Sequence, residues 1–298
     1  FSYDFRASAT YNKTFNNTHI ISLYGGMSVN KIDRHNTWFR GWGLQYDMGM
    51  EPYYDYLAFK QGMESGSKYY TIGDSFYREV AFFFNGTYSY KGRYTINGTY
   101  RYEGTNKMGK SRKARWLPTW NISGAWNVHE EKFFSHVQPA LSHLSLKASY
   151  SLTADRGPSY VTNSLAVIKA STPWRPTSGD TETGLKVSSL ENAQLTYEKK
   201  HELNIGADLG FLDNRINLTV DWYKRDNFDL IGRVMTQGIG GQIQKYGNVA
   251  TMKSRGIEFS LSTKNIKTKD FSWTTDFIYS HMKNEVTKFN TSTRAFNL

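Results

Sequence analysis

Polar and apolar side chains alternate with a period of two along this sequence, and the alternation limits the possible folds more than any other feature. Between residues 94 and 103, one parity reads Tyr, Ile, Gly, Tyr, Tyr and the other reads Thr, Asn, Thr, Arg, Glu. Segments that begin near residues 82, 144, 203 and 216 alternate in the same way. Successive side chains of a β-strand point to opposite faces, so each segment is predicted to be a strand with one apolar and one polar face.

About ten long strands are predicted from this pattern, which makes the fold class all-β. Most of them exceed the roughly 9–11 residues that a tilted strand needs to cross a bilayer. The predicted strands are Ser2–Asn12, His19–Asn30, Phe76–Tyr90, Arg93–Tyr102, Arg115–Val128, Leu144–Ala154, Thr196–Phe211, Arg215–Asn227, Thr251–Lys264 and Phe271–Glu285.

Short and long connections alternate between these strands, which favours a transmembrane antiparallel β-barrel over a soluble β-sandwich. Such a barrel has short periplasmic turns at one rim and long extracellular loops at the other, whereas a sandwich does not sort its connections by parity. The exception is His129–His143, about fifteen residues on the short side, which we expect to form a short helix or an Ω-type excursion. The short connections are Lys13–Thr18, Lys91–Gly92, Leu212–Asn214 and Asn265–Asp270, and the longer ones are Lys31–Ser75, Glu103–Ala114, Asp155–Leu195 and Phe228–Ala250.

Composition agrees with a barrel in the outer membrane. Aromatic residues make up 16% of the chain, many of them near strand ends, where interfacial girdles of a barrel lie. No apolar run reaches about 18 residues, so no transmembrane helix is predicted. The chain has no cysteine, which excludes disulfides, a thiol nucleophile and thiolate metal ligands.

The formal charge of +11 does not indicate a nucleic-acid partner, because the 37 basic residues are spread among 26 acidic ones. A nucleic-acid binder would show a basic stripe or a recognisable module. An anionic membrane surface, with lipid and lipopolysaccharide as partners, explains the excess equally well.

Several short motifs imitate chemical sites. Residues 104–111 (GTNKMGKS) match the phosphate-binding loop pattern, but an alternating half-polar strand precedes them and another strand, rather than a helix, is expected to follow. The group His129, Glu130, Glu131 and His136 lacks metal-ligand spacing, so surface polar residues are the better interpretation. We find no catalytic constellation, and we predict no enzyme, no cofactor and no metal.

Particular runs resemble the SusC/RagA family of TonB-dependent outer-membrane transporters. The resemblance covers nearly all residues from about 76 onward, and the first 75 residues carry no diagnostic run. The runs are 90–105 (YKGRYTINGTYRYEGT), 115–126 (RWLPTWNISGAW), 130–134 (EEKFF), 144–150 (LSLKASY), 197–215 (YEKKHELNIGADLGFLDNR), 248–261 (NVATMKSRGIEFSL) and 269–273 (KDFSW).

This resemblance implies a 22-stranded barrel with an N-terminal plug and a SusD-like lipoprotein that covers its mouth. It also implies import of oligosaccharides or peptides, driven through TonB. The sequence shows no plug and no TonB-contacting box, and about ten strands are too few for a plugged lumen of this class. An open sheet in lipid would leave unpaired edges. We therefore expect residues 1–298 to be part of one β-barrel domain, a fragment of a longer receptor whose missing N-terminal part contacts TonB.

Aromatic residues in the predicted loops are candidates to stack on substrate or to contact the lid. For any one of them, ordinary loop packing is the simpler explanation. The alternative function is a structural or protein-secretion barrel that imports no nutrient, which a plug and a TonB box in the complete gene would argue against. The candidate aromatics are Trp38, Trp42, Tyr46, Tyr53, Tyr54 and Trp174.

Overall fold

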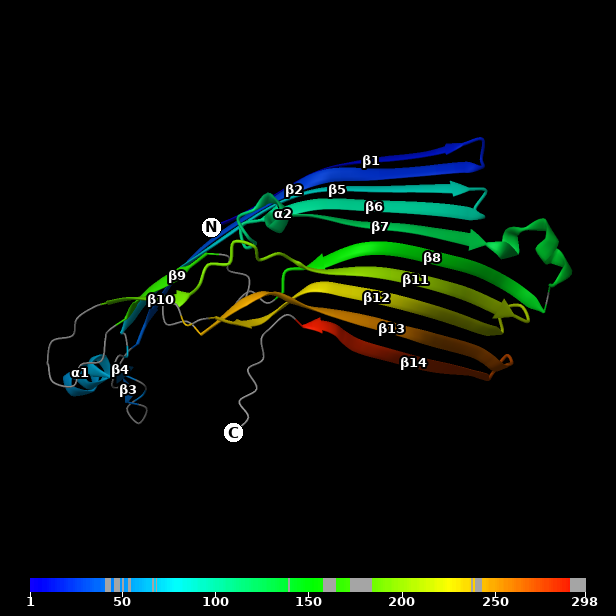
Figure 1. Cartoon of the computed structure of the whole chain (residues 1–298). Coiled ribbons are helices and arrows are strands. Elements are labelled where there is room, and N and C mark those ends of the chain that lie inside the picture. The colour runs from blue at the N-terminus through cyan, green and yellow to red at the C-terminus, as the bar shows by residue number, and fades with distance from the viewer. Residues whose placement is uncertain are drawn as a thin grey trace.

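The described residues form a ten-stranded antiparallel sheet in which the strands pair in chain order (Figure 1). The computed structural model describes residues 1–40, 44–45, 49, 51–52, 55–65, 67, 69–138, 140–157, 165–171, 184–236, 238 and 243–289. All ten predicted strands are confirmed. They are β1 (Ser2–Phe15), β2 (His19–Phe39), β5 (Tyr70–Tyr90), β6 (Tyr94–Thr105), β7 (Trp116–Asn127), β8 (Leu141–Asp155), β11 (Glu198–Phe211), β12 (Ile216–Met235), β13 (Gln244–Lys267) and β14 (Ser272–Phe289).

The register between strands keeps polar and apolar parities on separate faces. One row of cross-strand neighbours on the polar face is Thr87, Asn97, Ser123, Ser149 and Asn204. The next row, on the opposite face, is Tyr88, Ile96, Gly124, Ala148 and Ile205. Large apolar side chains of this second face are exposed in the isolated chain, as expected of a wall that faces lipid.

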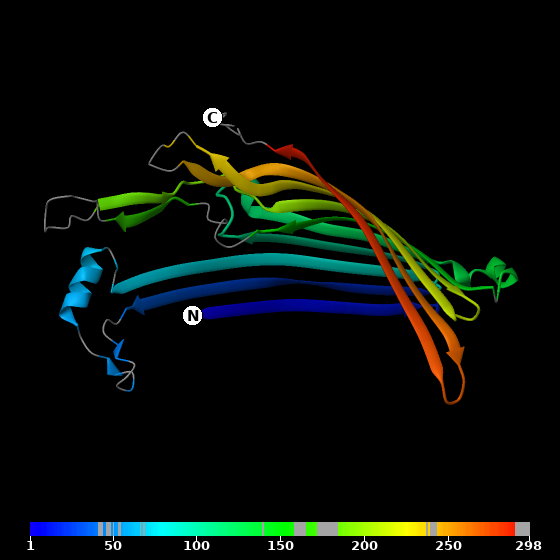
Figure 2. The same cartoon turned by 90° about the horizontal axis from the view of Figure 1, so that it is seen from below.

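The sheet is curved but does not close on itself. Within the described residues, β1 and β14 are the two edge strands, and their side chains are exposed along their whole lengths. Figure 2 shows β14 running obliquely to β1 across a trough. The ten strands therefore form part of a barrel wall, whereas the total of 22 strands and the position of the plug remain predictions.

Short connections gather at one end of the sheet, which we call the turn end (right in Figure 1). Asn16 and Asn17 both have positive φ, as do Lys91 and Gly92, which is the backbone required in the tight hairpin turns that match strand twist. Between β7 and β8 the chain forms two 3₁₀ helices, η2 (Val128–Glu130) and η3 (Lys132–His136), so the short-helix expectation for this connection is confirmed.

The opposite end, the loop end, carries the longer connections and their small elements. The first contains β3 (Leu44–Gln45), β4 (Glu51–Pro52) and helix α1 (Tyr56–Glu64), and a later one contains the hairpin of β9 (Val167–Ser171) and β10 (Gly184–Ser189). Among the described residues, no helix has the length and apolarity to cross a membrane.

Several strands extend further toward the loop end than the alternation predicts. The ladder of β12 and β13 continues past a bulge at Asn227–Leu230, where Asp229 has a φ of 56°, up to Met235 and Gln244. The predicted long connection Phe228–Ala250 is therefore wrong, and only residues 236–243 join these two strands. Outside the lipid both faces of the sheet contact water. The alternation of polar and apolar residues therefore ends there, while backbone pairing continues.

Candidate functional site

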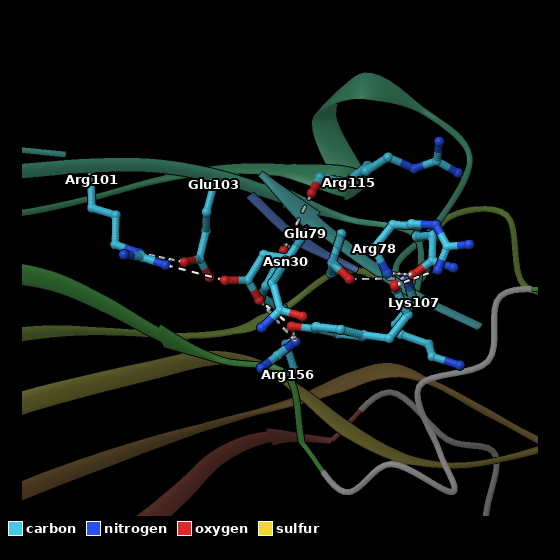
Figure 3. Close-up of polar contacts among 12 residues, drawn as sticks. Asn30, Arg78, Glu79, Arg101, Glu103, Lys107, Arg115 and Arg156 are labelled. Carbon is cyan, nitrogen blue, oxygen red and sulfur yellow. Dashed lines mark hydrogen bonds and ion pairs between the residues drawn. The ribbon is translucent and has the colours of Figure 1, made fainter. Parts of the chain in front are cut away.

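The polar face is the concave side of the sheet, and its loop end holds a cluster of charged residues beside a hollow of about 800 Å³ (Figure 3). Strands β2 and β5 and the loop after β6 supply one side of the hollow, and residues just after β8 supply the other. Residues that line it include Asn30, Arg34, Tyr77, Glu79, Lys107 and Arg156.

Glu79 is the centre of the charged cluster. Arg101 Nη2 lies 3.3 Å from Glu79 Oε1, and Arg156 Nη1 lies 3.3 Å from Glu79 Oε2. The Tyr77 hydroxyl lies between Glu79 and Arg156 and hydrogen bonds with both, and Arg101 Nε also lies 2.5 Å from Glu103 Oε2. The carboxylate of Glu79 is 19% exposed, so it depends on these cations for its charge balance.

Arg156 reaches Glu79 because β7 and β8 separate above their shared ladder. Their pairing ends at Trp120 and Leu152, whereas β8 continues to Asp155 alongside β11. The end of β8 is thereby free to cross the trough toward β5, as Figure 3 shows for the Arg156 side chain. This crossing joins residues that are 77 positions apart in the chain.

A small apolar core fixes the loop that supports Lys107. Met108 and Leu195 are fully buried, and Tyr197 and Leu117 are nearly so. Burial raises the pKa of the Tyr197 hydroxyl, which donates a hydrogen bond of 3.3 Å to the Arg115 carbonyl oxygen. The loop between β6 and β7 therefore packs as a rigid part of the concave wall.

The same packing explains why residues 104–111 do not form a phosphate loop. The backbone amides of Gly109 and Lys110 donate to the carbonyl oxygens of Leu195 and Ala193, at 2.8 and 3.1 Å. A single helical turn, α2 (Arg112–Arg115), follows with Ser111 as its N-cap, where the sequence predicted direct entry into a strand. Amides that are already bonded to protein cannot cradle a phosphate.

Further along the concave face, opposite charges are also paired. Lys147 forms an ion pair with Asp208, whose Oδ1 accepts a 3.0 Å hydrogen bond from Thr219. Glu202 lies between Lys200 at 2.6 Å and Arg225 at 3.2 Å. A second hollow of about 350 Å³ lies over this wall and is lined by Thr95, Asn97, Ser123, Lys147, Ser149, Asn204 and Asp221, among others.

Of the six aromatic residues predicted to contact substrate or lid, one lies among the described residues. Trp38 lies within β2, opposite Thr71, and is 57% exposed, so the prediction that it belongs to a loop is wrong. Its ring packs beside Gly73, because an added Cβ there would lie only 2.9 Å from it. The other candidates, Trp42, Tyr46, Tyr53, Tyr54 and Trp174, lie outside the described residues.

The charged cluster was not predicted as a site. The alternation places Glu79, Arg101 and Glu103 on the polar parity, but it gives no reason to join them to Arg156. No local sequence signal marks Tyr77 or Lys107 either. Only the separation of β7 from β8 brings these groups together.

The histidines and acids near residue 130 take part in packing at the turn end. The rings of His129 and His143 lie 4.0 Å apart, centre to centre. Glu131 accepts hydrogen bonds from the Tyr94 hydroxyl at 2.5 Å and the Trp126 indole at 3.3 Å, and forms an ion pair with Arg93 at 3.2 Å. The Tyr94 hydrogen bond is the main cause that holds the pKa of Glu131 below its usual value.

A curved sheet with an apolar convex face, a polar concave face and tight turns at one end is the wall of a membrane β-barrel. The chain belongs to the TonB-dependent receptor-like β-barrel family, whose family model matches residues 1–297. Proteins of this family are outer-membrane barrels, and the predicted resemblance to SusC/RagA transporters is confirmed.

Individual relatives and one solved structure agree with this assignment. TonB-dependent receptor P3 of Formosa agariphila is 28% identical over 94% of this chain and 26% of its own length. TonB-dependent receptor SusC of Bacteroides thetaiotaomicron is 31% identical over 60% of this chain and 18% of its own length. The RagAB peptide importer in its 'closed-closed' state has the same fold, with a TM-score of 0.79 at 21% identity over 97% of this chain and 30% of that one.

Proposed function

We propose that this chain forms part of the wall of an outer-membrane, TonB-dependent importer of oligosaccharides or peptides. The observation that carries the proposal is the continuous polar concave face with a large hollow at its loop end. A similar sequence named SusC and a similar fold named as a peptide importer support it. The chain spans about a quarter of the length of the first curated relatives it matches, which supports our proposal that this wall is part of a longer receptor.

The hollow fits a polar, partly anionic cargo. The cations Arg34, Lys107 and Arg156 outnumber the single acid Glu79 along its lining.

The partners and the orientation follow from the same proposal. A SusD-like lipoprotein covers the loop end, and TonB acts through the part of the receptor that precedes this wall. The loop end faces the cell exterior and the turn end faces the periplasm, as in outer-membrane barrels generally. No enzymatic step is assigned to the chain.

Growth of a deletion strain on a panel of glycans and peptides tests the transport function. Loss of growth on one substrate class, restored by the full-length gene, is the expected result. Complementation with Lys107→Glu should lower uptake of anionic members of that class, because it reverses one charge in the hollow. Lys132→Glu, an exposed change at the turn end, should not. Normal growth of the deletion strain on every substrate would favour a structural or protein-secretion barrel.

Single cysteines test the orientation separately. Lys186 in β10 and Asp213 at the opposite end are both exposed, and residues 1–298 contain no cysteine. In the full-length receptor, Lys186→Cys should react with a membrane-impermeant maleimide on intact cells. Asp213→Cys should react only after the outer membrane is opened. The reverse labelling pattern would overturn the orientation.

A further inference from the structure

Three cations lie side by side on the convex, apolar face of the sheet. Lys224 in β12 is opposite Arg255 in β13, and Arg255 is opposite Lys283 in β14. All three side chains are exposed. With Trp222 they line a hollow of about 280 Å³ on this face. A basic row on the lipid-facing side of a barrel is unexpected, because charges there are costly unless they reach the interface.

The row has little negative charge around it. Like charges directly opposite each other on neighbouring strands destabilise a sheet. Among the described residues, the only carboxylate within 4 Å of the row is Asp226, 3.9 Å from Lys224. The next row adds Lys253 and Glu285, which do not form an ion pair at that distance. Four cations against two acids leave an excess of positive charge that an external anion would relieve.

The height of the row places it near a headgroup layer. Lys224, Arg255 and Lys283 lie 8, 12 and 11 residues from the turn-end limits of their strands, Ile216, Lys267 and Ser272. At about 3.3 Å per residue and a tilt of about 40°, these side chains are roughly 20–30 Å above the turns. The apolar band of a barrel is about 25 Å tall, so the row lies at its far edge.

Apolar and aromatic side chains lie directly below the row on the same face. Trp222 precedes Lys224 on that face of β12, Ile257 and Phe259 follow Arg255 toward the turn end, and Tyr279 is opposite Phe259. The rings of Phe259 and Tyr279 are 6.2 Å apart, centre to centre. A ligand held at the row would thus place a charged group against the cations and an apolar chain against these side chains.

We propose that Lys224, Arg255 and Lys283 bind the phosphate of an outer-leaflet lipid, a phosphorylated glycolipid of the lipopolysaccharide type. The guanidinium of Arg255 can bond two phosphate oxygens at once, while the two lysines supply flanking charge. The site rests on the orientation proposed above, which places the loop end outside the cell, but not on the identity of any imported cargo.

The test uses the full-length receptor in nanodiscs that contain phosphatidylethanolamine and a minor fraction of either bis-phosphorylated lipid A or its dephosphorylated form. After extraction into detergent and washing, the lipid A that stays bound is measured by mass spectrometry. Wild-type receptor should retain the phosphorylated form about ten-fold more than the dephosphorylated one, which corresponds to a single charge-assisted contact. This comparison needs no variant.

The triple variant Lys224→Gln/Arg255→Gln/Lys283→Gln should lose that preference. The matched control is Lys264→Gln/Lys267→Gln/Lys269→Gln, which removes the same charge from exposed positions at the turn end of the same hairpin. The control should retain phosphorylated lipid as wild type does.

Four outcomes would overturn the proposal. One is equal retention of the two lipids by the wild type, and another is unchanged retention by the triple variant. In a third, the triple variant changes the oligomeric state by light scattering but not lipid retention, and the row is then a protein interface. Complete displacement of lipid by inorganic phosphate at equal concentration would show a general anion site rather than a lipid site.

Discussion

The acids of the concave wall and the basic row of the convex face differ in how their charge is balanced. On the concave face, Glu79, Glu202 and Asp208 each have a cationic partner within the sheet. On the convex face, Arg255 and Lys283 have no carboxylate within 4 Å among the described residues. A lumen must keep a fixed shape, and these three acids are neutralised within the wall. The basic row of Lys224, Arg255 and Lys283 instead suits a partner that the membrane supplies, unlike Arg78 and Lys31 on the same face, which are paired with Asp33.

The largest expected effect compares the packing around two glycines, one on each face. A Cβ at Gly26, which shares the concave parity, would overlap the Ala7 carbonyl oxygen and lie 2.8 Å from Ser8 Cα on β1. Because backbone cannot move aside cheaply, Gly26→Ala should cost about 2–3 kcal/mol. Gly98 on the convex face has nothing within 4 Å, so Gly98→Ala should be neutral within about 0.5 kcal/mol. Thermal loss of the compact band on unheated gels measures both; equal effects would contradict the packing difference.

The next effect tests the paired charges directly. Glu79→Ala leaves Arg101 and Arg156 without their shared carboxylate in the concave cluster. Both arginines are more than a third exposed, so the expected cost is about 1–2 kcal/mol rather than that of a fully buried pair.

The control on the convex face is Glu285→Ala, which removes an exposed acid without an ion-pair partner within 4 Å among the described residues. Its cost should stay below about 0.5 kcal/mol in the same melting assay. If Glu285→Ala destabilised the receptor as much as Glu79→Ala, the contrast between the faces would fail.

A smaller, pH-dependent effect on stability is expected at the turn end. There the carboxylate of Glu131 accepts hydrogen bonds from Tyr94 and Trp126 and forms an ion pair with Arg93. The pKa of Glu131 is lowered in the folded protein, mainly by the Tyr94 hydroxyl. Its contribution to stability is therefore complete above the unfolded pKa of about 4.3 and is lost as pH falls through the lower folded value. Glu131→Gln should melt earlier than wild type at pH 7, and the difference should shrink below about pH 4. A constant difference across this range would contradict the assignment.

The smallest effect on stability is expected from Asp226→Asn. The same variant should change how much phosphorylated lipid the receptor retains. This change removes the carboxylate nearest the convex row, 3.9 Å from Lys224. Exposed pairs are worth less than about 1 kcal/mol, so the melting temperature should hardly change while phosphorylated lipid retention rises by up to about three-fold. Lower retention would mean that Asp226 positions Lys224 rather than competing for it.

Sequence alone predicted the ten strands and their two faces because both depend on local alternation. It failed where that alternation stops. Trp38 and the strand segments beyond Asp229 lie past the apolar band, where polar neighbours no longer distinguish strand from loop. The cluster around Glu79 depends on the separation of β7 from β8, and the burial of Met108 depends on a loop folding inward. Neither arrangement has a signature within a few residues of the chain.

The strand order described above also has a consequence for how the wall assembles. Every ladder in the sheet joins strands that follow one another in the chain, so most hairpins can form before distant segments meet. The exceptions are the junction of β2 and β5, which residues 40–69 separate, and the junction of β8 and β11, which residues 156–197 separate. Closing loops of these lengths costs about 2 kcal/mol more chain entropy than closing a three-residue turn. At the second junction, bonds from Gly109 and Lys110 to Leu195 and Ala193 shorten the free chain. We therefore expect folding to proceed as hairpin stacks that join at these two junctions, the second one when residues 193–197 dock.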